Sequence, residues 1–145
     1  MRNFEMPGRS AAYGANGMAA TSHPRATLAA LDILRDGGNA VDAAVAAIAV
    51  HSVVEPAMTG IGGDCFALYA PAGGDIVAYN GSGRACGGAT TQWYLENGIT
   101  EIDAHSAHAV TVPGAVEAWS RLVQDHGTKE LGDLLSTAIE LAETG

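Results

Sequence analysis

The amino-acid sequence predicts an α+β fold that is rich in helix and short of sheet. Apolar residues recur at helical spacing in five segments, and proline or glycine marks the ends of most of them. Only two strand-like runs lie close together, which predicts a hairpin and no larger sheet. Because a hairpin alone is marginally stable in water, we expect the chain either to be one piece of a larger fold or to complete itself as an oligomer.

A change in composition near the N-terminus divides the chain into two parts. Residues 1–16 are polar and glycine-rich without a clear period, so they are expected to form an extended arm. The remaining residues, 17–145, contain neither an internal repeat nor a linker and are expected to form a single unit. That unit begins with a short strand predicted over residues 17–21.

Two helices are predicted next. Pro24 suits the first turn of a helix over about residues 24–36, because its missing N–H needs no partner there. Asn39 is a favourable N-cap for a second helix over residues 40–54, in which Asp42 is the only polar residue before His51. A helix that is apolar on every side must be covered on every side, so we expect the second helix to be central to folding.

The rest of the chain is expected to contain the hairpin and three more helices. Strand-like runs over residues 65–70 and 75–80 flank the turn Pro71-Ala72-Gly73-Gly74 and predict the hairpin. The helical patterns that follow are a short one over residues 91–97, one opened by Pro113 and ended by Gly127, and a last one with a stripe from Leu131 to Ala142.

Charge and composition restrict the class of partner. The 145 residues hold 16 acidic side chains against 7 basic ones, a formal net charge of −9, whereas nucleic acids and anionic membranes are bound through basic patches. No apolar run approaches the roughly 20 residues that cross a bilayer, and no secretory signal is visible. Two cysteines make a disulfide framework implausible. We therefore expect a cytoplasmic protein that binds neither nucleic acid nor membrane.

Several clusters carry weaker signals of chemistry. The glycine-rich run 60–64 is either a phosphate loop or a tight turn between packed backbones, and its place after a helix and before a strand favours the turn. The polar loop 101–108 either binds a metal or is solvated, and we expect no metal. Cys65 fits a small buried hydrophobe. Cys86 follows Arg84, whose charge would favour a thiolate, but no histidine is near, so no catalytic nucleophile is assigned.

The loop after the second strand is the most informative one. It reads Asn80-Gly81-Ser82-Gly83-Arg84 and contains one of the six arginines of the chain. Glycine lets the backbone approach a ligand closely, and the planar fork of arginine pairs bidentately with a carboxylate. From the residues alone, Arg84 is either a binding group for a substrate carboxylate or one half of a surface ion pair.

Five segments, taken in order, carry a specific family resemblance. They read Gly37-Gly38-Asn39-Ala40-Val41-Asp42-Ala43-Ala44, Val54-Glu55-Pro56, Gly60-Ile61-Gly62-Gly63, Val112-Pro113-Gly114-Ala115-Val116 and Ala138-Ile139-Glu140-Leu141-Ala142-Glu143-Thr144-Gly145. Together they resemble the N-terminal part of the large subunit of the γ-glutamyltransferase (γ-glutamyltranspeptidase) family. The resemblance covers nearly everything after Gly17.

The resemblance implies a fold, a reaction and partners. The fold is the αββα sandwich of the N-terminal nucleophile hydrolases, of which this chain would supply only part. The reaction is hydrolysis or acyl transfer on γ-glutamyl or related small amides, by a threonine that self-cleavage exposes at the start of the small subunit and that this chain does not contain. The implied partners are the remainder of the large subunit, the small catalytic subunit and the amide substrate. No cofactor or metal is implied.

One departure from the family pattern bears on the substrate. In glutathione-cleaving members, the resemblance implies an Arg-Glu-x-Ala-Pro segment whose arginine holds the substrate α-carboxylate. With the segment aligned on Ala85, Ser82 takes the place of that arginine, Arg84 lies two residues later and Cys86 replaces the proline. Arg84 and Ser82 are therefore the predicted substrate-binding residues, and glutathione, cephalosporin-type and oxamate-type amides are all candidate substrates. The alternative function is a non-catalytic, alanine-rich helical domain that binds a protein partner.

Overall fold

The computed structural model describes residues 11–145, so the first ten residues of the predicted arm lie outside the described part. Residues 11–16 are exposed and contain neither helix nor strand. The strand predicted over residues 17–21 is wrong for the described chain, because no other described segment pairs with its backbone. A strand depends on the hydrogen bonds of a partner strand. The division into an arm and a unit over 17–145 stays a prediction.

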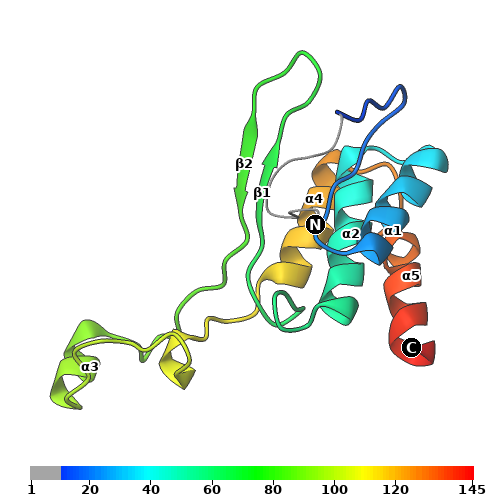
Figure 1. Ribbon diagram of the computed structural model, residues 1–145. Helices are drawn as coiled ribbons and strands as arrows, with labels where there is room; N and C mark the ends of the chain where they lie inside the picture. Colours follow the sequence, from blue (N-terminus) through cyan, green and yellow to red (C-terminus); the bar gives the residue numbers. More distant parts are fainter. Residues whose placement is uncertain (1–10) are drawn as a thin grey trace.

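Four helices form the body of the molecule (Figure 1). The first two, α1 (Pro24–Arg35) and α2 (Ala40–Val54), confirm the predicted helices. Later in the chain come α4 (Ala115–His126) and α5 (Leu131–Thr144), which also agree with the predicted patterns and contact α2. The second helix therefore packs against the other three helices of the body, and its expected importance for folding stays a prediction.

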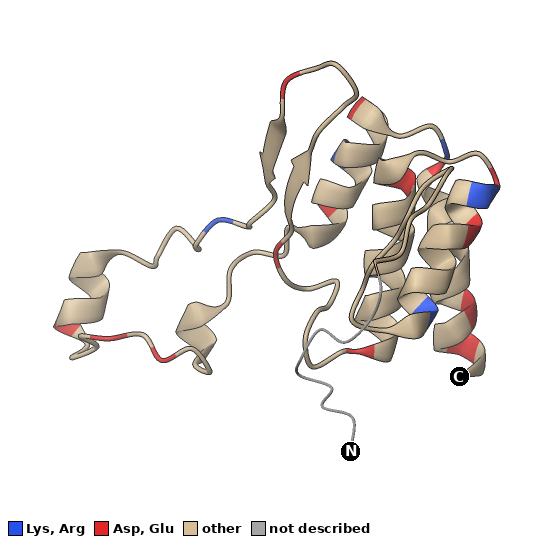
Figure 2. Ribbon diagram, turned by 45° about the horizontal axis from the view of Figure 1, so that its top comes forward, with Lys and Arg blue, Asp and Glu red and all other residues tan. Residues whose placement is uncertain are grey.

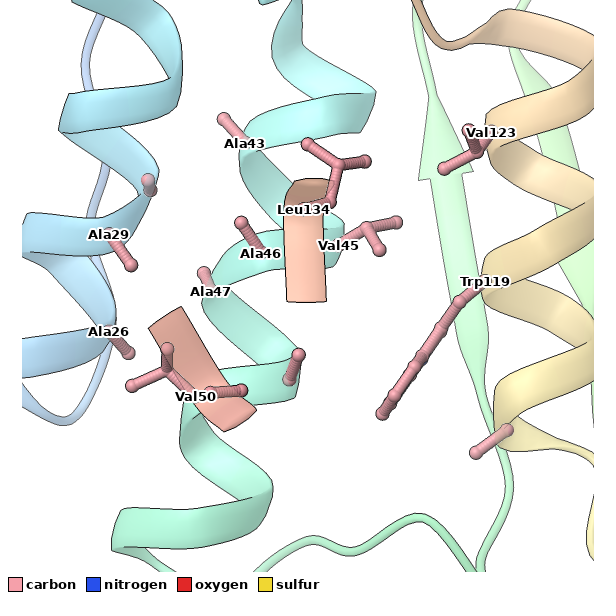
Figure 3. Packing of buried hydrophobic residues seen from close by; sticks show 14 residues of the cluster. Ala26, Ala29, Ala43, Val45, Ala46, Ala47, Val50, Trp119, Val123 and Leu134 are labelled. Atoms are coloured by element: carbon pink, nitrogen blue, oxygen red, sulfur yellow. The ribbon is translucent and has the colours of Figure 1, made fainter. Parts of the chain in front are cut away.

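Small side chains let α1 and α2 approach each other closely. Figure 3 shows Ala26 and Ala29 of α1 directed toward α2, while Trp119 and Val123 reach it from α4. Leu134 of α5 completes the cluster and is only 1% exposed. This alanine-rich cluster is the hydrophobic core of the described chain, and burial of apolar surface is the main force that stabilises a fold.

One side of α2 is left uncovered by the described residues. Ala40 and Ala44 are exposed and Ile48 is half-buried, and their four-residue spacing places them on one stripe. We name these three residues the α2 stripe. Grooves of about 350 and 420 Å³ lie along it and share all three residues, one bounded by β1 (Phe66–Tyr69) and the other by residues 17–21. The described residues thus leave the α2 stripe without the cover that an apolar helix needs, as expected for one piece of a larger fold or for a chain that completes itself as an oligomer.

The predicted hairpin is present as β1 and β2 (Val77–Asn80), an antiparallel pair in which Phe66 lies opposite Asn80. Beyond β2, the chain leaves the body, carries α3 (Thr91–Glu96) and the short 3₁₀ turn η1 (Ala107–Ala109), and returns to α4 (Figure 1). We name this excursion, residues 84–112, the projecting arm. The helix expected over residues 91–97 is α3.

Acidic side chains are spread over the helices and the projecting arm, whereas basic ones are few (Figure 2). This distribution matches the formal net charge of −9. Among the described residues, no helix is both long enough and apolar enough to span a membrane. The cytoplasmic location expected from the composition stays a prediction.

Candidate functional site

Three segments that are distant in sequence meet where the projecting arm joins the body. They are residues 63–65, 81–84 and 111–115. The Cys65 carbonyl accepts a hydrogen bond from the Gly81 N–H at 2.7 Å, which extends the hairpin beyond β1 and β2. This bond joins the first two segments, and the Val112 N–H, which donates to the Arg84 carbonyl, joins the third to the second.

The glycine-rich run forms a turn that supports the start of α4. Its Gly63 N–H donates to the Gly60 carbonyl at 3.3 Å, and the Gly63 carbonyl accepts from the N–H groups of Gly114 (3.1 Å) and Ala115 (3.0 Å). The first N–H groups of a helix have no partner within it, and this carbonyl accepts from those of Gly114 and Ala115. The turn expected at residues 60–64 is therefore observed.

Close backbone packing occurs at other glycines than those of the turn. A Cβ atom on Gly83 would lie 1.4 Å from the carbonyl oxygen of Val112, and one on Gly114 would lie 2.4 Å from the carbonyl oxygen of Gly81. By contrast, a Cβ atom on Gly60 would meet nothing within 4 Å. Glycine is thus required where the Arg84 loop crosses the chain that returns to α4.

Arg84 lies at the base of the projecting arm with its side chain exposed. Its guanidinium forms no salt bridge with any residue of the described chain, so the ion-pair alternative finds no partner there. Its backbone, in contrast, is held, because the Arg84 carbonyl accepts from the Val112 N–H at 3.0 Å. Within residues 11–145, Arg84 therefore combines an unpaired guanidinium with a backbone that is held by a hydrogen bond.

Ser82, the second predicted binding residue, is half-buried and lies two residues before Arg84. Its N–H donates to Oδ1 of Asn80 at 3.0 Å, and its hydroxyl donates to the Gly83 carbonyl at 3.4 Å. The Ser82 side chain thus shapes its own loop, whereas Arg84 projects from it. Substrate binding by Ser82 and Arg84 stays a prediction.

Asp64 is the residue of this site that sequence reasoning missed. Its Oδ1 atom accepts from the Gly83 N–H at 3.2 Å and from the Thr111 hydroxyl at 2.9 Å. One carboxylate oxygen therefore joins the outgoing and the returning ends of the projecting arm. The available signal was an acidic residue directly after two glycines and before a strand.

A second polar cluster lies at the N-terminus of α2. Asp42 is fully buried, and its carboxylate accepts from the Asn39 N–H at 2.8 Å, the Thr128 hydroxyl at 2.6 Å and the Thr128 N–H at 3.0 Å. Burial raises the pKa of Asp42, but the hydrogen bonds from Thr128 and Asn39 outweigh it and hold the pKa below its ordinary value. Asp42 thus ties α2 to the turn between α4 and α5.

The other end of α2 carries a smaller polar cluster. The Ser22 hydroxyl donates to Oε2 of Glu55 at 2.6 Å, and Nδ1 of His51 lies 2.7 Å from the same oxygen. The hydrogen bond from Ser22, followed by the contact with His51, lowers the pKa of Glu55 despite some desolvation. Glu55 therefore joins the end of α2 to the chain that precedes α1.

The remaining candidates do not form sites in the described residues. No three His, Cys, Asp or Glu side chains of residues 11–145 gather as metal ligands, and His108 of the loop 101–108 packs against the rings of Trp93 and Tyr94. Cys65 is partly buried, as expected, and burial raises the pKa of its thiol. We assign no catalytic nucleophile within residues 11–145.

Comparisons with known proteins agree with the family resemblance. The family model described as Gamma-glutamyltranspeptidase matches residues 26–145. The glutathione hydrolase-like YwrD proenzyme of Bacillus subtilis is 38% identical over 133 residues, which make up 91% of this chain and 25% of that protein. The oxamate amidohydrolase proenzyme of Klebsiella pneumoniae is 41% identical over 136 residues, which make up 90% of this chain and 25% of that protein.

A solved structure supports the fold. The match with the crystal structure of cephalosporin acylase from Bacillus halodurans covers 100% of this chain and 27% of the acylase chain, with a TM-score of 0.87 and 41% identity. The expected fold class, part of an N-terminal nucleophile hydrolase αββα sandwich, is therefore confirmed. The chain spans about a quarter of the length of these relatives. On the match over residues 26–145 and on these identities, the chain belongs to the gamma-glutamyltranspeptidase family.

Proposed function

We propose that the full-length protein is an amidohydrolase or acyltransferase that cleaves γ-glutamyl or related small amide bonds. Its relatives are named as a glutathione hydrolase-like protein, an oxamate amidohydrolase and a cephalosporin acylase. These names favour amide chemistry over the alternative of a non-catalytic helical domain. This chain would contribute substrate binding, and the nucleophile would come from the part of the protein that lies outside it.

The proposed reaction uses an N-terminal threonine of the small subunit. The hydroxyl oxygen bonds to the amide carbon, while the α-amine of the same threonine takes the hydroxyl proton and passes it to the departing amine. Water or an acceptor amine then adds to the ester carbon, and the bond between this carbon and the threonine oxygen breaks. The threonine oxygen takes back a proton, and the product is the free acid or a new amide. The word proenzyme in the names of two relatives supports processing into two subunits.

The observation that carries the proposal for this chain is the unpaired guanidinium of Arg84 on its anchored loop. Among the described residues, Arg35, Arg121 and Lys129 pair with acidic side chains, whereas Arg25 and Arg84 are exposed without such a partner. Of these two, Arg84 is the one that lies on the anchored loop. A carboxylate of the substrate would supply two acceptors that match the guanidinium fork. We therefore propose that Arg84 holds a carboxylate of the amide substrate.

The test compares two substrates that differ in one carboxylate, γ-glutamyl-p-nitroanilide and γ-aminobutyryl-p-nitroanilide. In the full-length protein, Arg84→Ala is expected to lower kcat/KM for the first about ten- to a hundredfold and to change the second little, since a charged hydrogen bond contributes about 1.5–3 kcal/mol. Arg84→Lys is expected to restore only part, because lysine offers a point charge. Arg121→Ala, which removes an exposed arginine paired with Asp125, is the matched control.

Each other outcome has a definite meaning. Equal losses on both substrates would make Arg84 a structural residue. No loss on either would leave Ser82 and the backbone of Gly81 and Gly83 as the candidate binding groups. A protein that cleaves neither these anilides nor glutathione, oxamate or a cephalosporin-type amide would contradict the proposed function itself.

The α2 stripe supports a proposal for the partners of this chain. Its two flanking grooves are lined mainly by apolar side chains, and the hairpin exposes Phe66 (69%) and Leu68 (79%). Apolar surface of this kind marks an interface. We propose that the remainder of the large subunit and the small subunit, rather than water, cover this surface in the full-length protein.

A further inference from the structure

We propose that Asp64 is a positioning residue of the carboxylate-binding site, acting through Arg84 and never touching the substrate. This inference rests on the proposed role of Arg84 and extends it, because it explains how a solvent-exposed arginine is held at a defined place.

The Arg84 backbone is held from two sides. On one side, the N–H of the preceding Gly83 donates to Oδ1 of Asp64 at 3.2 Å. On the other side, the Arg84 carbonyl accepts from the Val112 N–H at 3.0 Å. The guanidinium has no salt-bridge partner among residues 11–145. These two backbone hydrogen bonds therefore fix the position from which the Arg84 side chain extends.

The Val112 side of this support also depends on Asp64. The hydroxyl of Thr111 donates to the same Oδ1 atom at 2.9 Å, and Thr111 directly precedes Val112. Removal of the carboxylate therefore loosens both supports of Arg84 at once. The polar groups of Ser82, by contrast, bond to Asn80 and Gly83 and do not reach the returning chain.

Asp64 is itself fixed by its neighbours in sequence. The carbonyl of Gly63 before it holds the first turn of α4, and Cys65 after it pairs with Gly81. Asp64 thus connects the packed body to the base of the projecting arm, which otherwise leads away from the helices (Figure 1). A binding group that is held in its productive position spends less free energy on ordering when the ligand arrives.

The test uses the full-length protein and the same pair of p-nitroanilides. Asp64→Ala is expected to raise KM for γ-glutamyl-p-nitroanilide about tenfold, to leave its kcat within about twofold and to change γ-aminobutyryl-p-nitroanilide little. Asp64→Asn is expected to restore most of the affinity, because the amide oxygen accepts the same two hydrogen bonds. Asp75→Ala removes an equal charge from an exposed position in the hairpin turn and is the matched control.

A double substitution tests the route through Arg84. If Asp64 acts only by placing Arg84, then Asp64→Ala is expected to have no further effect on KM in a protein that already carries Arg84→Ala. Additive losses would show that Asp64 contacts substrate or acts elsewhere, and they would overturn the proposal. A failure of Asp64→Asn to restore affinity would overturn it as well, since the charge rather than the hydrogen bonds would then matter.

The outcomes also separate this inference from the proposed function. If Arg84→Ala affects both substrates equally, the carboxylate site at Arg84 is wrong and the positioning role falls with it. If Arg84→Ala discriminates between the substrates while Asp64→Ala has no effect on KM for either, only the positioning role is refuted.

Discussion

The buried carboxylate of Asp42 provides a direct test of how α2 is held in the fold. In Asp42→Ala, the N–H groups of Asn39, Thr128 and Lys129 would lose their acceptor. The Thr128 hydroxyl can rotate to another partner, whereas the backbone N–H groups cannot. Because these donors are only partly buried, each lost hydrogen bond is expected to cost about 1 kcal/mol, which gives a loss of about 3 kcal/mol in the free energy of unfolding.

Thermal unfolding of the full-length protein at neutral pH measures this loss. Because this chain spans about a quarter of its relatives' length, the unfolding entropy of the full-length protein is about four times that of a 145-residue unit, and the expected decrease in Tm is roughly 3 °C. The control is Asp32→Ala, because Asp32 forms only an exposed ion pair with Arg35 and such pairs contribute little. A Tm of Asp42→Ala within about 1 °C of the unchanged protein would refute the reasoning.

The pH dependence of the same comparison follows from the lowered pKa of Asp42. A carboxyl group whose pKa is lower in the folded state stabilises the protein above its unfolded pKa, about 4. That contribution is lost as the pH falls through the folded pKa. The Tm difference between the unchanged protein and Asp42→Ala is therefore expected to shrink below about pH 4. Glu55, whose pKa is also lowered, is present in both proteins and does not contribute to the difference. A constant difference from neutral to acid pH would contradict the assignment.

Three further predictions concern packing and activity. Val45 is 2% exposed, so Val45→Asp would bury an unpaired charge and is expected to abolish soluble full-length protein; a soluble variant with unchanged Tm would show that this face is exposed. Ala44→Glu, on the exposed α2 stripe, is expected to reduce the yield of assembled full-length protein in gel filtration, whereas Ala72→Glu in the hairpin turn is expected to leave it unchanged. The 145-residue chain by itself is expected to hydrolyse no γ-glutamyl-p-nitroanilide, and turnover in proportion to protein would point to a nucleophile such as Cys86.

The sequence by itself determined the features that arise from neighbouring residues. Pro24 and Asn39 mark the beginnings of α1 and α2, because the conformation of a helix start depends on a few adjacent residues. The apolar character of α2 predicted its central position. The same local reasoning placed Arg84 in a loop directly after β2, where its cationic side chain is exposed.

Only the tertiary structure decided the contacts that join distant parts of the chain. The Thr111 hydroxyl bonds to Asp64 across 47 residues, and the Thr128 hydroxyl bonds to Asp42 across 86 residues. Periodicity and turn patterns report on nearby positions and carry no information about such pairs. The strand expected over residues 17–21 was wrong for the same reason, because a strand is defined by a partner, and none of the described residues supplies one. The position of Arg84 likewise depends on Asp64 and Val112, which approach its loop only when the chain has folded.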